Sequence, residues 1–361
     1  MTQARRSALL AAVAAEGGPD VDALLVTSLV NVRYLTGFTG SNAAALVAPG
    51  VAVLATDVRY VTQAGDQCPD LDLVVDRAVA AALVAEAVRR GLRRVGFEAE
   101  ALSVAAHAAL LEVAAEGGAH LVPTQGLVEG LRVVKDDDEI AALNTACTIS
   151  QDALTTLLPQ LRPGLTEAAV AARLEGLMRE GGAEAPAFET IVAAGEHSAI
   201  PHHEPTDRPL RRGDLLKIDF GARYRGYHAD MTRTFVLGEP ADWQRDLHAL
   251  VARAQAAGRE ALAPGAELPQ VDAAARTVIA AAGHGEHFGH GLGHGVGLQI
   301  HEAPTIGYAA TGILADGTPV TVEPGVYLPG QGGVRIEDTL VVRPGGAESL
   351  TTASRELVVL G

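Results

Sequence analysis

Apolar and polar residues alternate in the stretch from Leu215 to Phe235, LLKIDFGARYRGYHADMTRTF. The alternation at its start predicts a strand with Asp219 on the face opposite Ile218. Gly226 predicts a turn, and the β-branched and aromatic residues after Asp230 predict a returning strand. The hairpin would bring the two aspartates together, and two buried carboxylates at close range repel unless a proton or a cation lies between them. A metal ion is the simplest such cation.

The same arrangement recurs later in the chain. Segments 320–327 and 334–342 each have a strand pattern, and they carry Glu323 and Glu337. The repetition predicts a duplicated unit of helix and hairpin whose two halves face each other, so that four acids converge between them. Four carboxylates carry a charge of about −4, which is more than one divalent ion neutralises. We therefore expect two metal ions.

A run rich in histidine and glycine surrounds His290 and His294. These two histidines are four residues apart, a spacing typical of metal-binding helices, but five glycines in residues 289–297 rule out a stable helix. Taken alone, the run is as typical of a solvated loop as of a ligand site. Beside four inward acids it is interpreted as a ligand loop. Salt bridges from the acids to Arg233 or Arg335 are the competing interpretation.

Before the repeat, hydrophobic runs alternate with helical patterns, which predicts an α/β domain over residues 1–131. We expect strands over residues 21–26, 32–36, 71–75 and 94–97, a hairpin over 43–55, and helices over 78–90 and 103–115, the last with Ser103 as N-cap. The composition changes at residues 131–139, LRVVKDDDE, where the acids favour the start of a helix. A second domain over residues 132–361 follows.

The second domain has helical patterns in two pairs, each followed by strand-like segments. We expect helices over residues 138–158, 166–181, 242–262 and 268–282, with Thr166 as an N-cap, and a strand over 188–194.

Composition adds limits to the class of protein. The chain has 361 residues, more than one domain usually has, and a formal net charge of −16, which argues against nucleic acid or an anionic membrane as a partner. Cys68 and Cys147 are the only cysteines, so we expect no disulfide framework and a cytoplasmic protein. Residues 1–16 have the basic start and short apolar run of a signal peptide, but their alanine-rich pattern favours an amphipathic helix. No stretch has the length of a transmembrane helix.

Five motifs resemble those of the pita-bread metallopeptidases. They are IDFGA, HADMTRT, GHGLGHGVG, VEPG and GVRIEDT, and they follow the order typical of that superfamily. SAIPHH at His202, together with NVRYLTGFTGSN and TDVRY in the first domain, is similar to the Xaa-Pro peptidases, prolidase and aminopeptidase P. The resemblance implies a creatinase-like N-terminal α/β domain followed by an α+β catalytic domain of two pseudo-twofold halves.

The resemblance also implies a dinuclear metal site. Its ligands would be Asp219, Asp230, His294, Glu323 and Glu337, with Asp230 and Glu337 bridging both ions. Hard oxygen donors with one imidazole suit Mn²⁺, with Co²⁺ and Zn²⁺ as alternatives. The ions would lower the pKa of a water molecule and polarise the scissile carbonyl, and Glu323 could move protons.

Further residues would act on the substrate. Three histidines are implied to stabilise the tetrahedral intermediate or to carry protons: His202, His290 and His301. Arg335 would lie on the same strand face as Glu337 and orient a carboxylate ligand. Phe188 and Ile300 match positions that line a proline pocket, with plain core packing as the competing interpretation.

The length of the substrate is left open by the resemblance. A dipeptidase must bind the free carboxylate of proline, for which a cation is efficient. No Lys or Arg occurs between Glu302 and Gly333, which taken alone favours aminopeptidase P, acting on longer peptides. Arg33, expected on a short strand before a Gly-rich loop, is a substitute, so we expect a prolidase that cleaves Xaa-Pro dipeptides.

Two further functions are compatible with the resemblance. A methionine aminopeptidase would have the same five ligands, but the N-terminal domain and the motif around His202 count against it. A non-catalytic binding homologue would keep the fold, but the intact ligand set counts against it. The family's N-terminal domains suggest a homodimer.

Overall fold

The structure is a computed structural model that describes residues 2–361. The chain divides into two compact units, the first ending at Arg132 and the second beginning at Val133. Each unit buries hydrophobic clusters of its own. Within residues 2–361, no helix combines the length and the hydrophobicity that crossing a bilayer requires.

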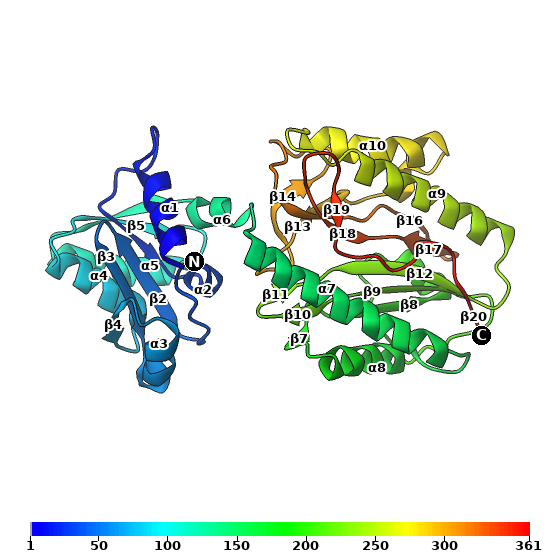
Figure 1. The fold of residues 1–361 in the computed structure, drawn as a ribbon, viewed down its shortest axis with the longest axis horizontal. Coiled ribbons are helices and arrows are strands. Elements are labelled where there is room, and N and C mark those ends of the chain that lie inside the picture. Colours follow the sequence, from blue (N-terminus) through cyan, green and yellow to red (C-terminus); the bar gives the residue numbers. More distant parts are fainter. Residues whose placement is uncertain (1) are drawn as a thin grey trace. The chain divides into compact units, whose positions relative to one another are not determined.

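The first unit is built on one six-stranded sheet with the strand order β4-β3-β2-β1-β5-β6 (Figure 1). β1, β5 and β6 run parallel to one another, whereas β2 is antiparallel to β1 and β3. The strands are β1 (Ala23–Val26), β2 (Ala43–Ala48), β3 (Val51–Thr56), β4 (Asp72–Val75), β5 (Arg94–Glu98) and β6 (His120–Thr124). The helices are α1 (Thr2–Ala14), α2 (Leu29–Thr36), α3 (Val61–Gln67), α4 (Val79–Arg89), α5 (Val104–Glu116) and α6 (Leu127–Arg132). The α/β class is confirmed. Within the segment 1–16, residues 2–14 form helix α1 as expected, and Met1 lies outside the described residues.

One expected strand of the first unit is a helix. The sequence predicts a strand over residues 32–36, and this prediction is wrong because α2 covers the segment. Val32 and Leu35, three positions apart, are both fully buried on one face of the helix. Gly37 then ends α2 with a left-handed φ of 82°, which costs glycine little. Packing and the C-cap outweigh the strand preference of the β-branched and aromatic residues.

The second unit places its strands between two pairs of helices, as Figure 1 shows. The helices are α7 (Asp137–Leu157), α8 (Glu167–Glu180), α9 (Asp242–Glu260) and α10 (Leu268–Ala281). The strands are β7 (Ala185–Pro186), β8 (Ile191–Ala194), β9 (Leu215–Phe220), β10 (Ala222–Tyr224), β11 (Tyr227–His228), β12 (Met231–Leu237), β13 (Gly293–Gly295), β14 (Glu302–Ile306), β15 (Pro319–Val322), β16 (Gly325–Leu328), β17 (Gly332–Arg335), β18 (Asp338–Val341), β19 (Glu348–Ser349) and β20 (Val359–Leu360).

The two halves of this unit follow the same plan. In the first half α7 and α8 bury their apolar faces with β8, β9 and β12, in a sheet of order β20-β12-β9-β8. In the second half α9 and α10 pack with β15 and β18, in a sheet of order β14-β13-β15-β18-β19. A helix pair packed on a sheet therefore occurs twice, and the predicted pita-bread fold class is confirmed.

Side-chain caps set several helix starts. Ser103 accepts a hydrogen bond from a backbone N–H at 3.2 Å at the start of α5, and Thr166 does the same at 3.1 Å at the start of α8, as predicted. α7 begins within the acidic run, where Asp136 and Glu139 form a reciprocal capping box.

The acidic segments of the second half are broken strands. The sequence predicts single strands over residues 320–327 and 334–342, and this is wrong, since β16 and β17 pair only with each other while β15 and β18 belong to the larger sheet. Glu323 and Glu337 lie in the two breaks. Pro324, which has no N–H to give to a ladder, follows the first of them. Each acid therefore lies between two strands rather than within a ladder of hydrogen bonds.

Candidate metal centre

The hairpin that carries the first two acids is confirmed. β9 pairs with β12 in an antiparallel register that sets Asp219 opposite Thr232. The turn between β10 and β11 contains Gly226 at a φ of 78°. Asp230 directly precedes β12 and is 4% exposed. The two aspartates therefore lie at the same end of the β9–β12 ladder.

A cavity of about 350 Å³ in the second unit contains this end of the hairpin. All five expected metal ligands line it, together with His202, His301, Arg335, Phe188 and Ile300. The remaining lining residues are Glu189, Thr190, Ile191, His203, Glu204 and Pro205. Phe188 precedes β8, which begins only at Ile191, so the strand expected over residues 188–194 is shorter than predicted.

Carboxylates from both halves meet around one imidazole. Ligand atoms of Asp230, His294 and Glu337 lie within 4.8 Å of one another. His294 Nε2 is 3.5 Å from Asp230 Oδ2 and 3.4 Å from an oxygen of Glu323. His294 lies in β13, an extended strand, which agrees with the prediction that its glycine-rich surroundings exclude a helix.

Without a cation, burial and mutual repulsion oppose the ionisation of these carboxyl groups. Burial, followed by the charges of neighbouring acids, raises the pKa of Asp230 and of Glu337 well above the usual range. Burial and the nearby Asp219 raise the pKa of Glu323 to about 8, against the opposing charge of Arg335. Burial lowers the pKa of His294 to about 4, so its imidazole is neutral near pH 7, the form that ligates metals.

The donor set fits divalent metal ions. Asp219 Oδ1 is buried and has no hydrogen-bond partner among the described residues, although its other oxygen has one. A buried carboxylate oxygen without a partner costs free energy unless a cation satisfies it. Four carboxylates and a neutral imidazole supply the hard and borderline donors that such ions prefer.

Arg335 contacts Asp219 rather than Glu337. Its Nη2 donates to Asp219 Oδ2, and its Nη1 donates to the hydroxyl of Tyr327 at 2.8 Å. The expectation that Arg335 and Glu337 share a strand face is wrong, because β17 ends at Arg335 and Glu337 lies in the break after it. Of the expected metal ligands, Asp219 therefore forms the salt bridge that the competing interpretation proposed, through one of its two oxygens.

His290 lies behind the cavity wall. It is not among the lining residues, and its Nε2 lies 2.9 Å from the Tyr327 hydroxyl. Burial, followed by the charge of Arg335, lowers the pKa of His290 to about 4. Sequence reasoning missed Tyr327, which joins His290 to Arg335. The residue lies in an otherwise apolar strand, β16, and no spacing signal marks it.

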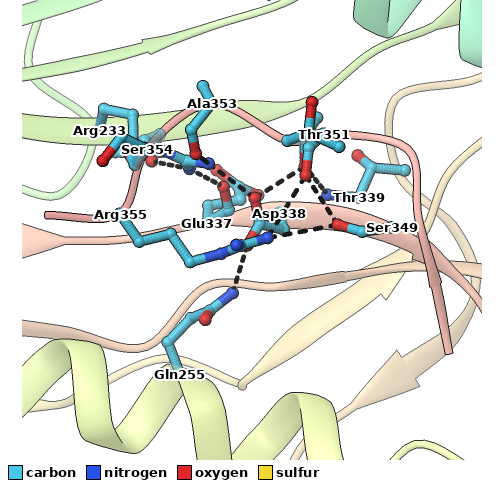
Figure 2. Close-up of polar contacts among 12 residues, drawn as sticks. Arg233, Gln255, Glu337, Asp338, Thr339, Ser349, Thr351, Ala353, Ser354 and Arg355 are labelled. Atoms are coloured by element: carbon cyan, nitrogen blue, oxygen red, sulfur yellow. Dashed lines mark hydrogen bonds and ion pairs between the residues drawn. The ribbon is translucent and has the colours of Figure 1, made fainter. Parts of the chain in front are cut away.

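A buried polar cluster holds the break that carries Glu337 (Figure 2). Asp338, fully buried, accepts hydrogen bonds from Arg233, Gln255, Thr351 and Arg355. Arg233 donates to the backbone carbonyl of Glu337 at 2.5 Å. Figure 2 shows these groups converging from strands, from helix α9 and from the C-terminal segment. Arg233, proposed as a competitor for the acids of the site, is thus occupied with Asp338 and with carbonyl groups.

The Glu337 carboxylate itself is oriented from the other hairpin. Thr232 in β12 donates its hydroxyl to Glu337 Oε2 at 2.6 Å, and Arg335 Nε donates to the same hydroxyl oxygen at 3.1 Å. In the sequence, Thr232 is indistinguishable from any β-branched residue of a strand, so the sequence does not predict its contact with Glu337.

His202 and His301 reach the cavity from irregular segments. His202 is exposed, and partial desolvation followed by the charge of Arg335 lowers its pKa. The ring of His301 packs edge-on against His294 with centroids 4.5 Å apart. Arg33 lies on α2 in the first unit, where its side chain is half-buried. Arg335 is the one Lys or Arg among the described residues that line the cavity.

A duplicated helix-and-sheet unit that gathers acids and an imidazole around one cavity is the architecture of a metal-dependent peptidase. Residues 141–344 match the model of metallopeptidase family M24, and residues 5–134 match that of the creatinase/prolidase N-terminal domain. The chain belongs to metallopeptidase family M24. It is 40% identical over 341 residues to the uncharacterized peptidase YqhT of Bacillus subtilis. The matched region covers 94% of this chain and 96% of that protein.

Several relatives named for an activity are Xaa-Pro peptidases. The Xaa-Pro dipeptidase of Pyrococcus furiosus is 44% identical over 232 residues, 64% of this chain and 67% of that protein. Among solved structures, an Xaa-Pro dipeptidase from Bacillus anthracis is similar over 100% of both chains, with a TM-score of 0.95 and 38% identity. An X-Pro aminopeptidase from Thermotoga maritima is similar over 94% of this chain and 98% of its own, with a TM-score of 0.88 and 36% identity.

Proposed function

We propose that this protein is an Xaa-Pro dipeptidase that uses two divalent metal ions. The observation that carries the proposal is the full-length likeness to the Bacillus anthracis Xaa-Pro dipeptidase, with a TM-score of 0.95 over 100% of both chains. The ligand set expected from the sequence lines a single cavity, which supports the same activity.

The ions would be held by residues that the fold already gathers: Asp219, Asp230, His294, Glu323 and Glu337. When bound, they supply Lewis-acid chemistry that activates water and polarises a carbonyl group. We propose Mn²⁺ as the native metal, because carboxylate oxygens dominate the donor set, with Co²⁺ and Zn²⁺ as alternatives.

The remaining cavity residues bind substrate and move protons. His202 and His301 line the cavity as hydrogen-bond donors or acceptors for the scissile carbonyl group. Arg335 holds one oxygen of Asp219, and the other oxygen would be available to a metal ion. Phe188 and Ile300 supply apolar surface for the proline ring.

An Xaa-Pro bond suits this kind of site. The amide nitrogen of proline carries no hydrogen, and its ring fixes φ, so peptidases that grip the substrate through that N–H cannot use it. A site that acts mainly on the carbonyl group has no need of the missing donor.

A peptide panel tests the proposed function. Metal-loaded protein should cleave Ala-Pro faster than Ala-Pro-Ala and should leave Met-Ala-Ala essentially intact, as measured by product chromatography. Preference for Ala-Pro-Ala would establish aminopeptidase P instead, and preference for Met-Ala-Ala a methionine aminopeptidase. No turnover of any of the three in metal-loaded protein would contradict the proposal.

We also propose Arg33 as the cation that binds the substrate carboxylate. The cavity lining supplies no arginine or lysine besides Arg335 among the described residues, and Arg335 is already engaged by Asp219. Arg33→Ser should raise KM for Ala-Pro by about tenfold or more and leave Ala-Pro-Ala less affected, since a charge-assisted hydrogen bond is lost. Arg59→Ser, at an exposed arginine of the first unit, is the control. An unchanged ratio of the two substrates in Arg33→Ser would remove Arg33 from the site.

The chain carries two buried, unpaired cysteines, Cys68 and Cys147, which supports a reducing compartment. We propose a cytoplasmic location on this basis, and fractionation of the host cells tests it.

A further inference from the structure

Residues 202–205, around His202, are held by side chains, whereas Thr206 and Arg208 after them accept backbone hydrogen bonds from Ala168 and Glu167. Residues 195–199 form one 3₁₀ turn, and no helix or strand covers residues 200–214. Within the described part of the chain, no backbone-to-backbone hydrogen bond is made by residues 202–205. Something other than regular structure must therefore fix the position of His202.

One anchor lies just before His202 and consists of two buried basic side chains. Lys217, in β9 and fully buried, donates to the backbone carbonyls of Ile200 at 2.6 Å, Pro201 at 3.2 Å and Ser198 at 3.3 Å. Arg335 Nη1 adds a hydrogen bond to the Pro201 carbonyl at 3.1 Å. The backbone is thereby fixed up to the residue before His202.

The second anchor lies just after His202 and is a single anion, Glu167. This residue occupies the first turn of α8 and is fully buried. Its carboxylate accepts hydrogen bonds from His203 Nε2 at 2.9 Å, from His197 Nδ1 at 3.0 Å, and from the Thr206 N–H and hydroxyl at 3.1 and 2.7 Å. It also accepts from the N–H of Ala194 at 2.8 Å. One carboxylate thus ties both ends of the segment together.

Electrostatics keep this anchor ionised. Burial opposes the charge of Glu167, but the hydrogen bonds from His203, Ala194 and Thr206 outweigh it and lower the pKa of the carboxyl group. The helix N-terminus also favours a negative charge at this place.

From this geometry we infer that Glu167 is a positioning residue for catalysis, which acts by fixing the His202 segment between its own carboxylate and the buried basic side chains of Lys217 and Arg335. Glu167 does not line the cavity, so it touches neither substrate nor the expected metal ligands. Its effect on turnover must then pass through the residues it holds. The inference rests on the proposed peptidase function.

A double-mutant cycle on metal-loaded protein tests this. Glu167→Gln should lower kcat for Ala-Pro by about 10- to 100-fold with KM changed by less than about twofold, because small displacements of a reacting group cost this much. His202→Ala should lower kcat by about 10²–10³-fold with full metal content, the usual loss for one stabilising hydrogen bond. Once His202 is absent, Glu167→Gln should have little further effect on kcat.

Two further variants separate positioning from stability. Thr206→Val removes one donor to Glu167 with little change of shape, and it should show the same non-additivity with a smaller loss, so it replaces Glu167→Gln if that variant does not fold. Glu139→Gln is the matched control, since Glu139 is also a buried glutamate in the first turn of a helix that accepts a backbone N–H, from Asp136 at 3.0 Å. It should lower the unfolding temperature and leave kcat unchanged.

The outcomes are distinct. Losses of kcat that multiply in the double variant would overturn the inference, because Glu167 would then act independently of His202. A lower metal content in Glu167→Gln would also overturn it and would make the Glu167, His197 and His203 group a metal site. Absence of Ala-Pro turnover in the wild-type protein would instead refute the proposed function.

Discussion

At the scale of single residues, the site is defined by charges that the fold does not neutralise by itself. Asp230 is buried beside Asp219 and Glu323, and these neighbours together with burial raise its pKa well above the ordinary value. The ionised form is therefore stable only when a cation is present, which links metal binding to the protonation state of this carboxyl group.

Asp230→Asn should separate metal binding from folding. The variant should lose metal and lower kcat by at least about 10²-fold, because a ligand is removed. In the metal-free state its unfolding temperature should equal or exceed that of metal-free wild type, since a neutral amide replaces a carboxyl group whose ionisation burial and neighbouring acids oppose. Elemental analysis, peptide hydrolysis and calorimetry measure the three quantities. A variant with full metal content and normal turnover would contradict the two-metal interpretation.

At the scale of elements, helix α9 carries a buried group whose charge state opposes folding in acid. His248 is 5% exposed, and burial followed by the charge of Arg233 lowers its pKa to about 4. The ordinary value is about 6.5, so between these pH values the unfolded chain binds a proton that the native protein does not. Stability contributed by neutral His248 is thus present above about pH 6.5 and is lost as the pH falls towards 4.

His248→Gln should therefore flatten the acid side of the stability profile. The difference in unfolding free energy between pH 7 and pH 4.5 should shrink by up to about 3 kcal/mol relative to wild type. Urea unfolding in the presence of a chelator measures it without the contribution of bound metal. His120→Gln, at an exposed strand position, is the control. Parallel profiles for wild type and His248→Gln would show that His248 is charged in the native state.

At the scale of the whole molecule, we expect a homodimer. The expectation comes from the resemblance of the first unit to N-terminal domains that mediate dimers. Light scattering at micromolar concentration should give twice the mass of one 37.2 kDa chain. A mass of one chain at all concentrations tested would rule the dimer out.

The sequence alone predicted the parts of this protein that depend on local patterns. Alternation predicted the hairpin of Asp219 and Asp230, and capping chemistry predicted the caps at Ser103 and Thr166, because both depend on residues close in the chain. The duplicated helix-and-sheet plan could be predicted because the same local pattern occurs twice in the sequence. The five expected ligands could be named from motifs, and the fold brings them to one cavity.

Only the tertiary structure decided what depends on distant partners. Residues 32–36 form part of a helix because burial of one face and the Gly37 cap outweigh strand preference. Glu323 and Glu337 lie in breaks between sheets, where pairing with different partners interrupts strands that look continuous in the sequence. Contacts from Tyr327, Lys217 and Glu167 each join segments far apart in the chain. No local pattern encodes such contacts, because their free energy arises only when burial removes competing water.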